Sequence, residues 1–517
     1  MCENREILQV AAGVAVRSGK ACGRKPDMNA CRKSDILIVP TIAPNEGSQR
    51  PEEAKEEREM TKGNSRQQPA GAQAQSWDNP WMGLERIRQA ARRDSGQRFN
   101  SLMHHLTLPL MRKTFKELRK DAAGGVDEQT WREYKIGLED RLSELHERVQ
   151  NGRYRAKPSK RAYIPKPDGE QRPIGIAALE DKIVQGTVVR VLNQIYEEDF
   201  LGFSYGFRPE RGTHKALDAV WVGIMRRKIN WVLDADIRSF FDSLDHDWMM
   251  RFVEHRIGDR RVLRLIGKWL RAGVSEQGQW SKTKVGTPQG SVISPLLANI
   301  FLHYVLDLWV NKWRETRAKG EMIIVRYADD FVMGFQYRDE AQQCLNDLAQ
   351  RMGKFNLRIH EQKTWLIEFG RFAKRDRHAR GEGKPETFDF LGFTHICATT
   401  RENNRFTIRR KPIAKRMARK LKEIKTELMK RRHNDVANQG QWLNMVLHGY
   451  FNFFAVPGTS EVLSVFRKQV CRTWLRALRR RSHKARKLTW KRVQKLFDEW
   501  VPKVRIVHPY PNQRLIV

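Results

Sequence analysis

The chain has 517 residues, which is long enough for several domains rather than one. Lys and Arg total 97 against 60 Asp and Glu, so the net charge is +37. This excess argues against an enzyme of small neutral metabolites and indicates a polyanionic partner, of which nucleic acid is the commonest. A membrane partner is not expected, because no apolar run approaches the ~20 residues that a spanning helix needs.

The first 80 residues differ in composition from the rest of the chain. The stretch 45–75 is rich in Glu, Lys, Gln, Ser, Gly and Pro and poor in large apolar residues. We therefore expect residues 1–80 to be mostly disordered. The six cysteines include no Cys-x-x-Cys pair, which argues against a zinc module and favours a reduced, cytoplasmic protein.

From about residue 81 the pattern is that of a mixed α and β protein. The predicted elements, in chain order, are helices at about 84–91, 108–118 and 138–149, a β-hairpin at 161–176, a helix at about 180–196, a Gly- and Pro-rich loop at 202–212 and a strand at 231–233. The hairpin prediction depends on Asp168-Gly169, because Asp-Gly favours the tight turns that join antiparallel strands.

A second pair of apolar strands is predicted at 322–325 and 331–335, separated by Arg326-Tyr-Ala-Asp-Asp330. The turn between these strands must place two carboxylates at the tip of a hairpin. After about residue 400 the pattern becomes helical and basic. An apolar stripe at helical spacing predicts a long helix there, and it consists of Ile413, Met417, Leu421, Ile424 and Leu428.

Three aspartates have an arrangement that suits nucleotidyl transfer. Asp236 comes just after the apolar strand at 231–233, while Asp329 and Asp330 lie at the hairpin tip. Joining a nucleotide to a primer needs an activated 3′-oxygen and a stabilised pyrophosphate, which two Mg²⁺ ions ~3.5–4 Å apart can supply. Because Mg²⁺ keeps waters and substrate phosphates as ligands, the protein needs to supply only two or three carboxylates.

Other interpretations of these aspartates remain open at this point. An Asp-Asp pair alone is more often a polar turn, but apolar strands on both sides favour a functional pair. Neighbouring carboxylates compete with Asp236 for the role of the third ligand, and these are Asp234, Asp242, Asp245 and Asp247.

Several motifs together resemble those of group II intron-encoded reverse transcriptases with their maturase region. Tyr327-Ala-Asp-Asp330 is similar to the catalytic hairpin of that family. Asp234-Ala-Asp-Ile-Arg-Ser-Phe-Phe-Asp242 is similar to the motif with the first catalytic Asp, which falls on Asp236 because the aromatic pair follows at the family's offset. The likeness begins at about Gly125 and continues to the C-terminus, with the motifs in the family's order.

The resemblance implies an α+β right-hand polymerase followed by a helical domain. Fingers and palm, with an antiparallel sheet, are expected at 81–398. A thumb or maturase domain is expected at 399–483, and a short basic segment at 484–517.

The resemblance also implies a nucleotide site. Phe241 resembles the aromatic gate that packs against the nucleotide sugar and so favours dNTPs over rNTPs; a core Phe is the alternative. Lys166 and Arg172 resemble fingers residues that grip the triphosphate. Gln289, in a Gly-rich family loop, is expected near the incoming base pair. Lys363 resembles a lysine that neutralises or protonates pyrophosphate, although a solvated lysine is nearly as common.

RNA contacts are expected from basic residues of one loop and of the C-terminal helices. These candidates are Arg208, Arg416, Arg419, Arg472, Arg476 and Arg480. The implied partners are an RNA template with a DNA or RNA primer, dNTPs, group II intron RNA and a DNA target site; a homodimer is left open.

The function that this resemblance implies is RNA-directed DNA polymerisation with two Mg²⁺ ions, together with binding of intron RNA as a splicing maturase. Two alternatives are kept. One is a domesticated reverse transcriptase in antiviral defence, and the other is an RNA-binding splicing factor without polymerase activity.

Overall fold

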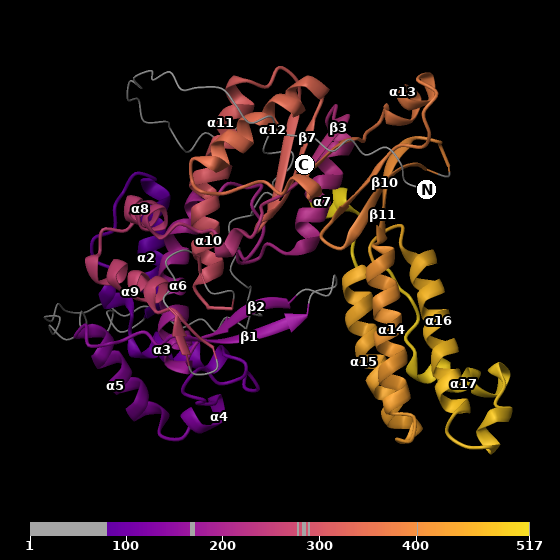
Figure 1. Cartoon of the computed structure of the whole chain (residues 1–517), viewed down its shortest axis with the longest axis horizontal. Helices are drawn as coiled ribbons and strands as arrows, with labels where there is room; N and C mark the ends of the chain where they lie inside the picture. Colours follow the sequence, from indigo (N-terminus) through magenta and orange to yellow (C-terminus); the bar gives the residue numbers. More distant parts are fainter. Residues whose placement is uncertain are drawn as a thin grey trace, which may run out of the picture.

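The computed structural model describes residues 80–165, 171–276, 279–281, 286–287, 290–400 and 402–515. The expected disordered segment 1–80 therefore lies, except for its last residue, outside the described residues. Figure 1 shows a central body with two arms, one formed by the N-terminal helices and the β1–β2 hairpin and the other by the C-terminal helices. The expected α+β class is confirmed.

The strands are β1 (Ser159–Pro165), β2 (Gln171–Ile176), β3 (Trp231–Asp236), β4 (Val274–Glu276), β5 (Gln279–Ser281), β6 (Met322–Tyr327), β7 (Asp330–Phe335), β8 (Trp365–Glu368), β9 (Thr387–Phe390), β10 (Phe393–Thr399) and β11 (Phe406–Pro412). They form three sheets, with strand orders β2-β1-β4-β5, β6-β7-β3-β8 and β11-β10-β9. The hairpins predicted at 161–176 and 322–335 are confirmed as β1–β2 and β6–β7.

The helices of the fingers and palm are α2 (Pro80–Arg93), α3 (Leu108–Glu117), α4 (Trp131–Tyr134), α5 (Leu138–Gln150), α6 (Leu179–Asp199), α7 (Thr213–Arg226), α8 (His246–Arg256), α9 (Arg260–Arg271), α10 (Ser294–Leu302), α11 (Leu308–Thr316), α12 (Arg338–Gly353) and α13 (Ala373–Ala379). The C-terminal helices are α14 (Ala414–Lys430), α15 (Val436–Phe454), α16 (Ser460–Arg479), α17 (Trp490–Trp500) and α18 (Pro511–Arg514). No described helix is long and apolar enough to span a bilayer.

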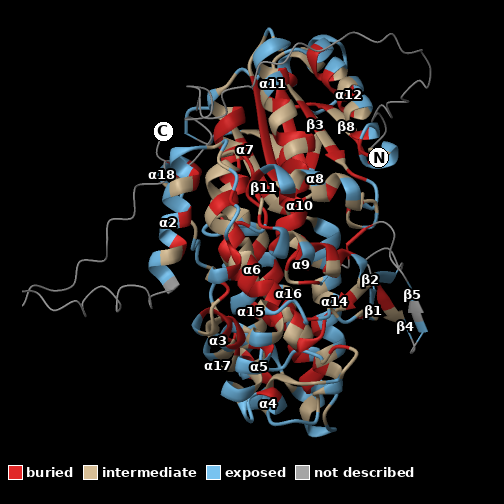
Figure 2. Cartoon of the chain, turned by 90° about the vertical axis from the view of Figure 1, so that its left-hand side faces the viewer, coloured by how far each residue is buried: buried red, intermediate tan, exposed pale blue. Residues whose placement is uncertain are grey.

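The four-stranded palm sheet is antiparallel throughout and is buried on both faces. Alternate residues of β6 enter different cores: Ile323 and Val325 pack with α7, whereas Met322 and Ile324 join the large core shared with the fingers. Strands buried on both faces read as continuous apolar runs, which explains why this pattern was visible in the sequence. Figure 2 shows the buried residues concentrated on central elements such as α6, α10 and β3.

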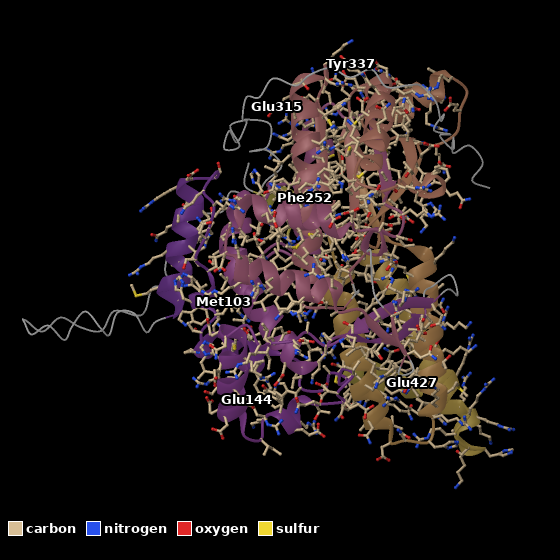
Figure 3. All side chains as sticks on the ribbon, turned by 60° about the vertical axis from the view of Figure 1, so that its left-hand side comes forward. Met103, Glu144, Phe252, Glu315, Tyr337 and Glu427 are labelled. Atoms are coloured by element: carbon tan, nitrogen blue, oxygen red, sulfur yellow. The ribbon has the colours of Figure 1, made fainter. Side chains whose placement is uncertain are left out.

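Aromatic packing joins α8 and α10 beneath the palm sheet. Phe252, labelled in Figure 3, lies with its ring centroid 5.3 Å from that of Phe301 and 5.1 Å from that of Tyr304. Phe355, after α12, completes the group at 5.8 Å. Such pairs add stability beyond their buried area, so this group fixes the helices against which the sheet rests.

The expected limits of the thumb, 399–483, do not match the packing. At the N-terminal limit, β10 pairs with β11 from Phe393 to Pro412, so the sheet continues past residue 399. At the C-terminal limit, Phe497 and Val501 are buried in the same core as Ile424. We therefore propose that the helical domain runs from α14 to about residue 501, because a hydrophobic core must include all the elements that bury it.

The chain then returns to the palm. The Val507 backbone N–H donates to the Ala455 carbonyl (3.1 Å), and Leu515 is buried in the core that α7 shares with the sheet. The Arg514 guanidinium lies 3.3 Å from Asp218 of α7, which also pairs with Arg410. The final segment therefore connects the base of the thumb to the palm.

Candidate active site at the tip of the palm sheet

The palm sheet brings the three predicted aspartates together at one end. Asp236, the last residue of β3, is directly opposite Asp330, the first residue of β7. Asp329 occupies the turn between β6 and β7, next to Ala328, whose φ is +59°. The expectation that these elements are adjacent is confirmed. Their role in binding metal stays a prediction.

The backbone around this turn leaves no room for larger side chains. A Cβ on Gly206 would lie 2.2 Å from the Ala328 backbone nitrogen, a distance that no side chain accepts. The Asn299 side-chain amide donates to the Gly206 carbonyl (2.7 Å). Because Gly206 has no Cβ, the loop 202–209 can lie directly against the carboxylate turn.

Arg326, three residues before Asp329, is fully buried and fixes the turn between β6 and β7. Its guanidinium makes a bidentate ion pair with Asp307 (2.7 and 2.6 Å). The same group donates to Asn299 Oδ1 (3.0 Å), to Ser204 Oγ (2.7 Å) and to the Ala328 carbonyl (2.9 Å). The last of these bonds holds the turn itself.

Asp307 comes from an unusual helical segment. It ends a π-helical turn, His303–Asp307, which lies between α10 and α11. Wide turns of this kind are rare and often occur at functional sites. Burial raises the pKa of Asp307, and the charge of Arg326 opposes that rise. The π turn thus supplies the carboxylate that neutralises Arg326 in the palm core.

Negative charge accumulates at the sheet end. Burial, followed by the charges of Asp329 and Asp236, raises the pKa of Asp330 to about 7. Burial and the charge of Asp236 also raise the pKa of Asp329, while Arg172 opposes this. Lys363, in the short helix Glu361–Lys363, lies with its Nζ 3.6 Å from Asp236 Oδ2. The Asp330 carboxyl therefore holds its proton to near neutrality, because burial and the neighbouring negative charges both disfavour its charged form.

Two of the predicted nucleotide-site residues, Arg172 and Lys363, interact electrostatically with these carboxylates. Arg172 is exposed on β2 and acts electrostatically on Asp329. The Phe241 carbonyl accepts from the Thr287 backbone N–H (2.9 Å), which places the family loop beside the predicted gate. The ring of Phe241 is half-buried against the large core. Lys166 and Gln289, and the Asp168-Gly169 turn, lie outside the described residues.

The predicted RNA contacts divide into two groups. The predicted RNA contact of Arg208 is wrong. Its side chain is 2% exposed and pairs with Glu197 (3.0 Å), while its Nη1 donates to the Leu201 and Ser204 carbonyls. A buried and fully paired arginine cannot reach an RNA backbone in this conformation. Its position in a glycine-rich loop gave no sequence signal of that burial.

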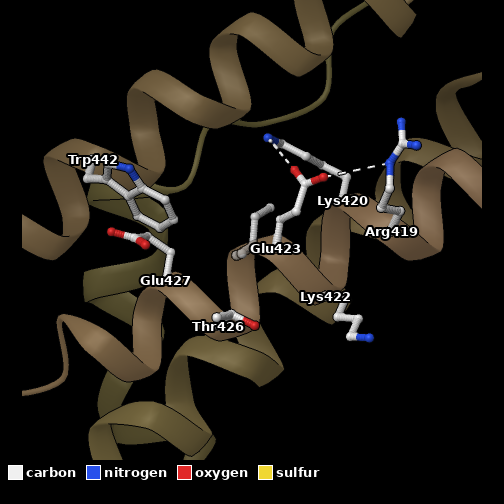
Figure 4. A pocket seen from close by; sticks show the side chains of 8 residues that line it. Arg419, Lys420, Lys422, Glu423, Thr426, Glu427 and Trp442 are labelled. Atoms are coloured by element: carbon white, nitrogen blue, oxygen red, sulfur yellow. Dashed lines mark hydrogen bonds and ion pairs between the residues drawn. The ribbon is translucent and has the colours of Figure 1, made fainter. Parts of the chain in front are cut away.

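The arginines on the thumb are exposed. Arg416, in the first turn of α14, lies beside Gly392 and lowers the pKa of Asp330, so it faces the carboxylate end of the palm sheet. Figure 4 shows Arg419 and Lys420 on either side of Glu423, which pairs with both. On α16, Arg472 and Arg476 are exposed, as is Arg480 directly after the helix. Arg476 and Arg480 line a cavity of about 860 Å³ that Lys425 of α14 also lines.

Of the four competitors for the third carboxylate, Asp245 has a structural role. It caps α8, accepting from the backbone N–H groups of Asp247 and Trp248 (2.9 and 3.1 Å). Asp242 and Asp247 are exposed. Asp234 lies within β3, opposite Val332, two residues from the sheet end. Among these candidates, Asp236 alone lies at the end of β3, opposite Asp330.

Sequence reasoning missed Arg326 and Asp307, because their pairing is visible only in three dimensions. An arginine inside an apolar strand is an available signal, since a buried charge must be paired. The π turn and Asn299 carried no signal in the sequence.

A divalent cation fits the donors at this site. In the part of the chain that the structure describes, no three His, Cys, Asp or Glu side chains converge tightly enough to hold an ion alone. Mg²⁺ does not require such convergence, because it retains waters and takes phosphate oxygens of the substrate. The hard carboxylate oxygens and the raised pKa of Asp330 match a site completed by a cation.

The raised pKa of Asp330 predicts that this residue destabilises the metal-free fold. In the unfolded chain the carboxyl is ionised above its ordinary pKa of 3.8, whereas the folded protein retains the proton up to about 7. Stability therefore falls as pH rises between these values. Without divalent ions, Asp330→Asn should raise the thermal midpoint by a few degrees at pH 8 and by much less at pH 5.

Differential scanning calorimetry in EDTA measures this effect. Asp121→Asn is the control, because that exposed carboxylate pairs only with Arg132 at 3.0 Å. Added Mg²⁺ should shrink the advantage of the Asp330 variant. A lower midpoint for Asp330→Asn at pH 8 would contradict the electrostatic account.

Comparison with known proteins supports one family. The family model "Reverse transcriptase (RNA-dependent DNA polymerase)" matches residues 164–395. Protein YkfC of Escherichia coli is 34% identical over 46% of this chain and 71% of its own length. The group II intron-encoded protein LtrA of Lactococcus lactis is 36% identical over 37% of this chain, which covers 32% of LtrA.

Two further likenesses are weaker. An uncharacterised 91 kDa protein in the cob intron of Schizosaccharomyces pombe is 31% identical over 45% of this chain and 29% of its own length. A solved apo telomerase from Candida tropicalis aligns with 46% of this chain and 53% of its own at a TM-score of 0.35 and 14% identity, and it carries no part of the assignment.

The matched region holds β3, the β6–β7 hairpin and the carboxylates at its tip, so the sequence likeness and the site geometry coincide. The chain belongs to the reverse transcriptase (RNA-dependent DNA polymerase) family, in the branch of group II intron-encoded reverse transcriptases and maturases.

Proposed function

We propose that this protein copies RNA into DNA by adding dNTPs to a primer 3′ end, with Asp236, Asp329 and Asp330 holding two Mg²⁺ ions. The observation that carries this proposal is the register of the palm sheet, which sets Asp236 opposite Asp330. When bound, the two ions would lower the pKa of the primer 3′-hydroxyl and neutralise the leaving pyrophosphate.

The surrounding side chains have complementary tasks in this proposal. Lys363, 3.6 Å from Asp236, holds positive charge where phosphate oxygens would bind and can donate a proton to the departing pyrophosphate. Arg172 extends from the fingers hairpin and suits the triphosphate, because a guanidinium forms paired bonds to phosphate. Arg416 approaches from the thumb side, where the primer backbone would lie.

Binding of intron RNA is the second function that we propose. The supporting observation is the cavity between α14 and α16, whose cationic lining includes Lys425, Arg476 and Arg480. The cationic cavity of the thumb and the carboxylates of the palm are separate sites, so one chain can both bind intron RNA and polymerise DNA.

Primer extension on an RNA template tests the polymerase proposal. Asp329→Ala should reduce extension by about 10³-fold or more, because removal of a metal ligand deprives the transition state of charge stabilisation worth several kcal/mol. Asp247→Ala, an exposed neighbour on α8, should leave the rate unchanged. Wild-type protein that binds RNA tightly but extends no primer would contradict the proposal and favour a splicing factor without polymerase activity.

The position of Phe241 predicts that this ring selects dNTPs over rNTPs. The ring offers no hydrogen-bond partner to a 2′-hydroxyl and fills the space beside it, so Phe241→Ala should raise ribonucleotide incorporation relative to dNTP incorporation by about tenfold or more. Single-nucleotide extension with dNTP or rNTP measures the ratio of kcat/KM values. Tyr337→Ala, at an exposed ring beyond the other end of β7, is the control. An unchanged ratio in the Phe241 variant would remove the gate role.

A further inference from the structure

A large cavity lies at the end of the palm sheet away from the carboxylates. Its volume is about 1520 Å³, and its walls come from the end of α7, the segment 370–387 around α13, and β10 with β11. Figure 1 shows α13 at the outer corner of the palm, beyond β10 and β11. Trp231 begins β3 at this end of the sheet and lies opposite Glu368 of β8. Trp231 is five residues along the strand from Asp236, which corresponds to roughly 17 Å at ~3.3 Å per residue.

The wall of this cavity is held in place by paired charges. Arg380 pairs with both Glu368 and Glu382, and its Nε lies 2.8 Å from Glu382. Arg377 lies 3.3 Å from Glu382 and 3.8 Å from Glu368. The Cys397 thiol lies 3.7 Å from the Gly370 carbonyl, to which it donates, and so joins the segment to β10. The charges of Glu368 and Glu382 are therefore neutralised by Arg377 and Arg380.

The charge that remains around the opening is positive on balance, because Glu386 is the one further acid among the described lining residues and four cations outweigh it. Lys374, Lys384 and Arg405 are exposed and have no ion-pair partner among the described residues. Arg371 is also exposed, and its guanidinium donates to the Met225 carbonyl (3.0 Å) rather than to a carboxylate. A ligand for this rim would therefore be anionic.

The floor of the cavity is apolar. Met225, Cys397 and Phe406 line it and pack, partly buried, against the palm core. An aromatic ring beneath a cationic rim is the combination that binds single-stranded nucleic acid, with bases on the ring and phosphates on the cations. A duplex keeps its bases stacked inside and could not present them to Phe406.

The volume supports a polymeric ligand, because small-molecule sites measure about 300–1,000 Å³. We infer that this cavity binds a single-stranded segment of nucleic acid, outside the cleft where the primer and template would lie. The site is independent of nucleotidyl transfer, since its walls share no residue with the carboxylate end.

Fluorescence anisotropy with a short labelled oligouridylate tests this inference. The protein is first saturated with an unlabelled RNA–DNA hybrid ending in a dideoxynucleotide, so that the main cleft is occupied. The double variant Lys374→Glu/Arg405→Glu should bind the oligonucleotide about tenfold more weakly. The slope of log affinity against log salt should fall by about 1.4, because each phosphate contact to a single strand contributes ~0.7.

The control is Lys319→Glu/Lys354→Glu, which makes the same change in charge at two exposed lysines near α11 and α12. This control should bind the probe as the wild type does. Both double variants should extend a short primer normally, which shows that they fold. A second probe, labelled oligodeoxythymidylate, shows whether the cavity binds RNA or DNA. Weaker binding of either probe by the Lys374/Arg405 variant supports the site.

Equal affinities of the wild type and the Lys374/Arg405 variant for both probes would overturn the inference, as would equal weakening in the control. Failure of the wild type to extend primers would contradict the polymerase proposal alone, because the anisotropy measurement does not depend on catalysis.

Discussion

The buried ion pair between Arg326 and Asp307 fixes the turn that carries Asp329 and leads into Asp330. Arg326 binds four parts of the chain at once: the π turn, Asn299 of α10, the loop 202–209 and the carbonyl of Ala328. A buried pair of this kind contributes little net stability, because desolvation offsets much of the attraction. Its consequence is positional, since two adjacent aspartates that repel each other need a rigid support.

The palm shows why the repulsion is tolerated. Asp236, Asp329 and Asp330 are brought together by backbone pairing, which their own charges oppose. Strand register is set by the buried faces of β3 and β7, so the energy that forces the carboxylates together comes from the core. A site that is destabilising without its cation is a common property of active sites, where strain serves function.

The sequence contained most of the palm and its carboxylates. Apolar strands around Asp329-Asp330 and the strand before Asp236 were identifiable from local pattern, because doubly buried strands leave continuous apolar runs. Contacts between residues far apart in the sequence were not identifiable. Examples are the ion pair of Arg326 with Asp307 and the packing of Leu515 in the palm core. Composition also gave no sign that Phe497 lies in the same core as Ile424, which is the reason for the longer thumb that we propose.

Net charge was a good guide to the partner and a poor guide to individual contacts. Arg208, Arg256, Arg326 and Arg410 are all buried and paired with carboxylates. These arginines hold the palm and fingers together, so they do not contribute to a surface for RNA. Exposed cations that have no carboxylate partner among the described residues instead include Arg472 and Arg476 on the thumb, and Lys374 and Arg405 around the cavity.

We propose that the three carboxylates at the end of the palm sheet hold the catalytic cations. Localised cleavage tests it most directly: Fe²⁺ replaces Mg²⁺, and ascorbate with peroxide generates hydroxyl radicals that cut the backbone beside the bound metal. With a dideoxy-terminated primer on RNA and the next dNTP, the account predicts cuts near Asp236 and near Asp329 that disappear in Asp329→Ala. Cleavage elsewhere, or cleavage at these positions that persists in the variant, would contradict it.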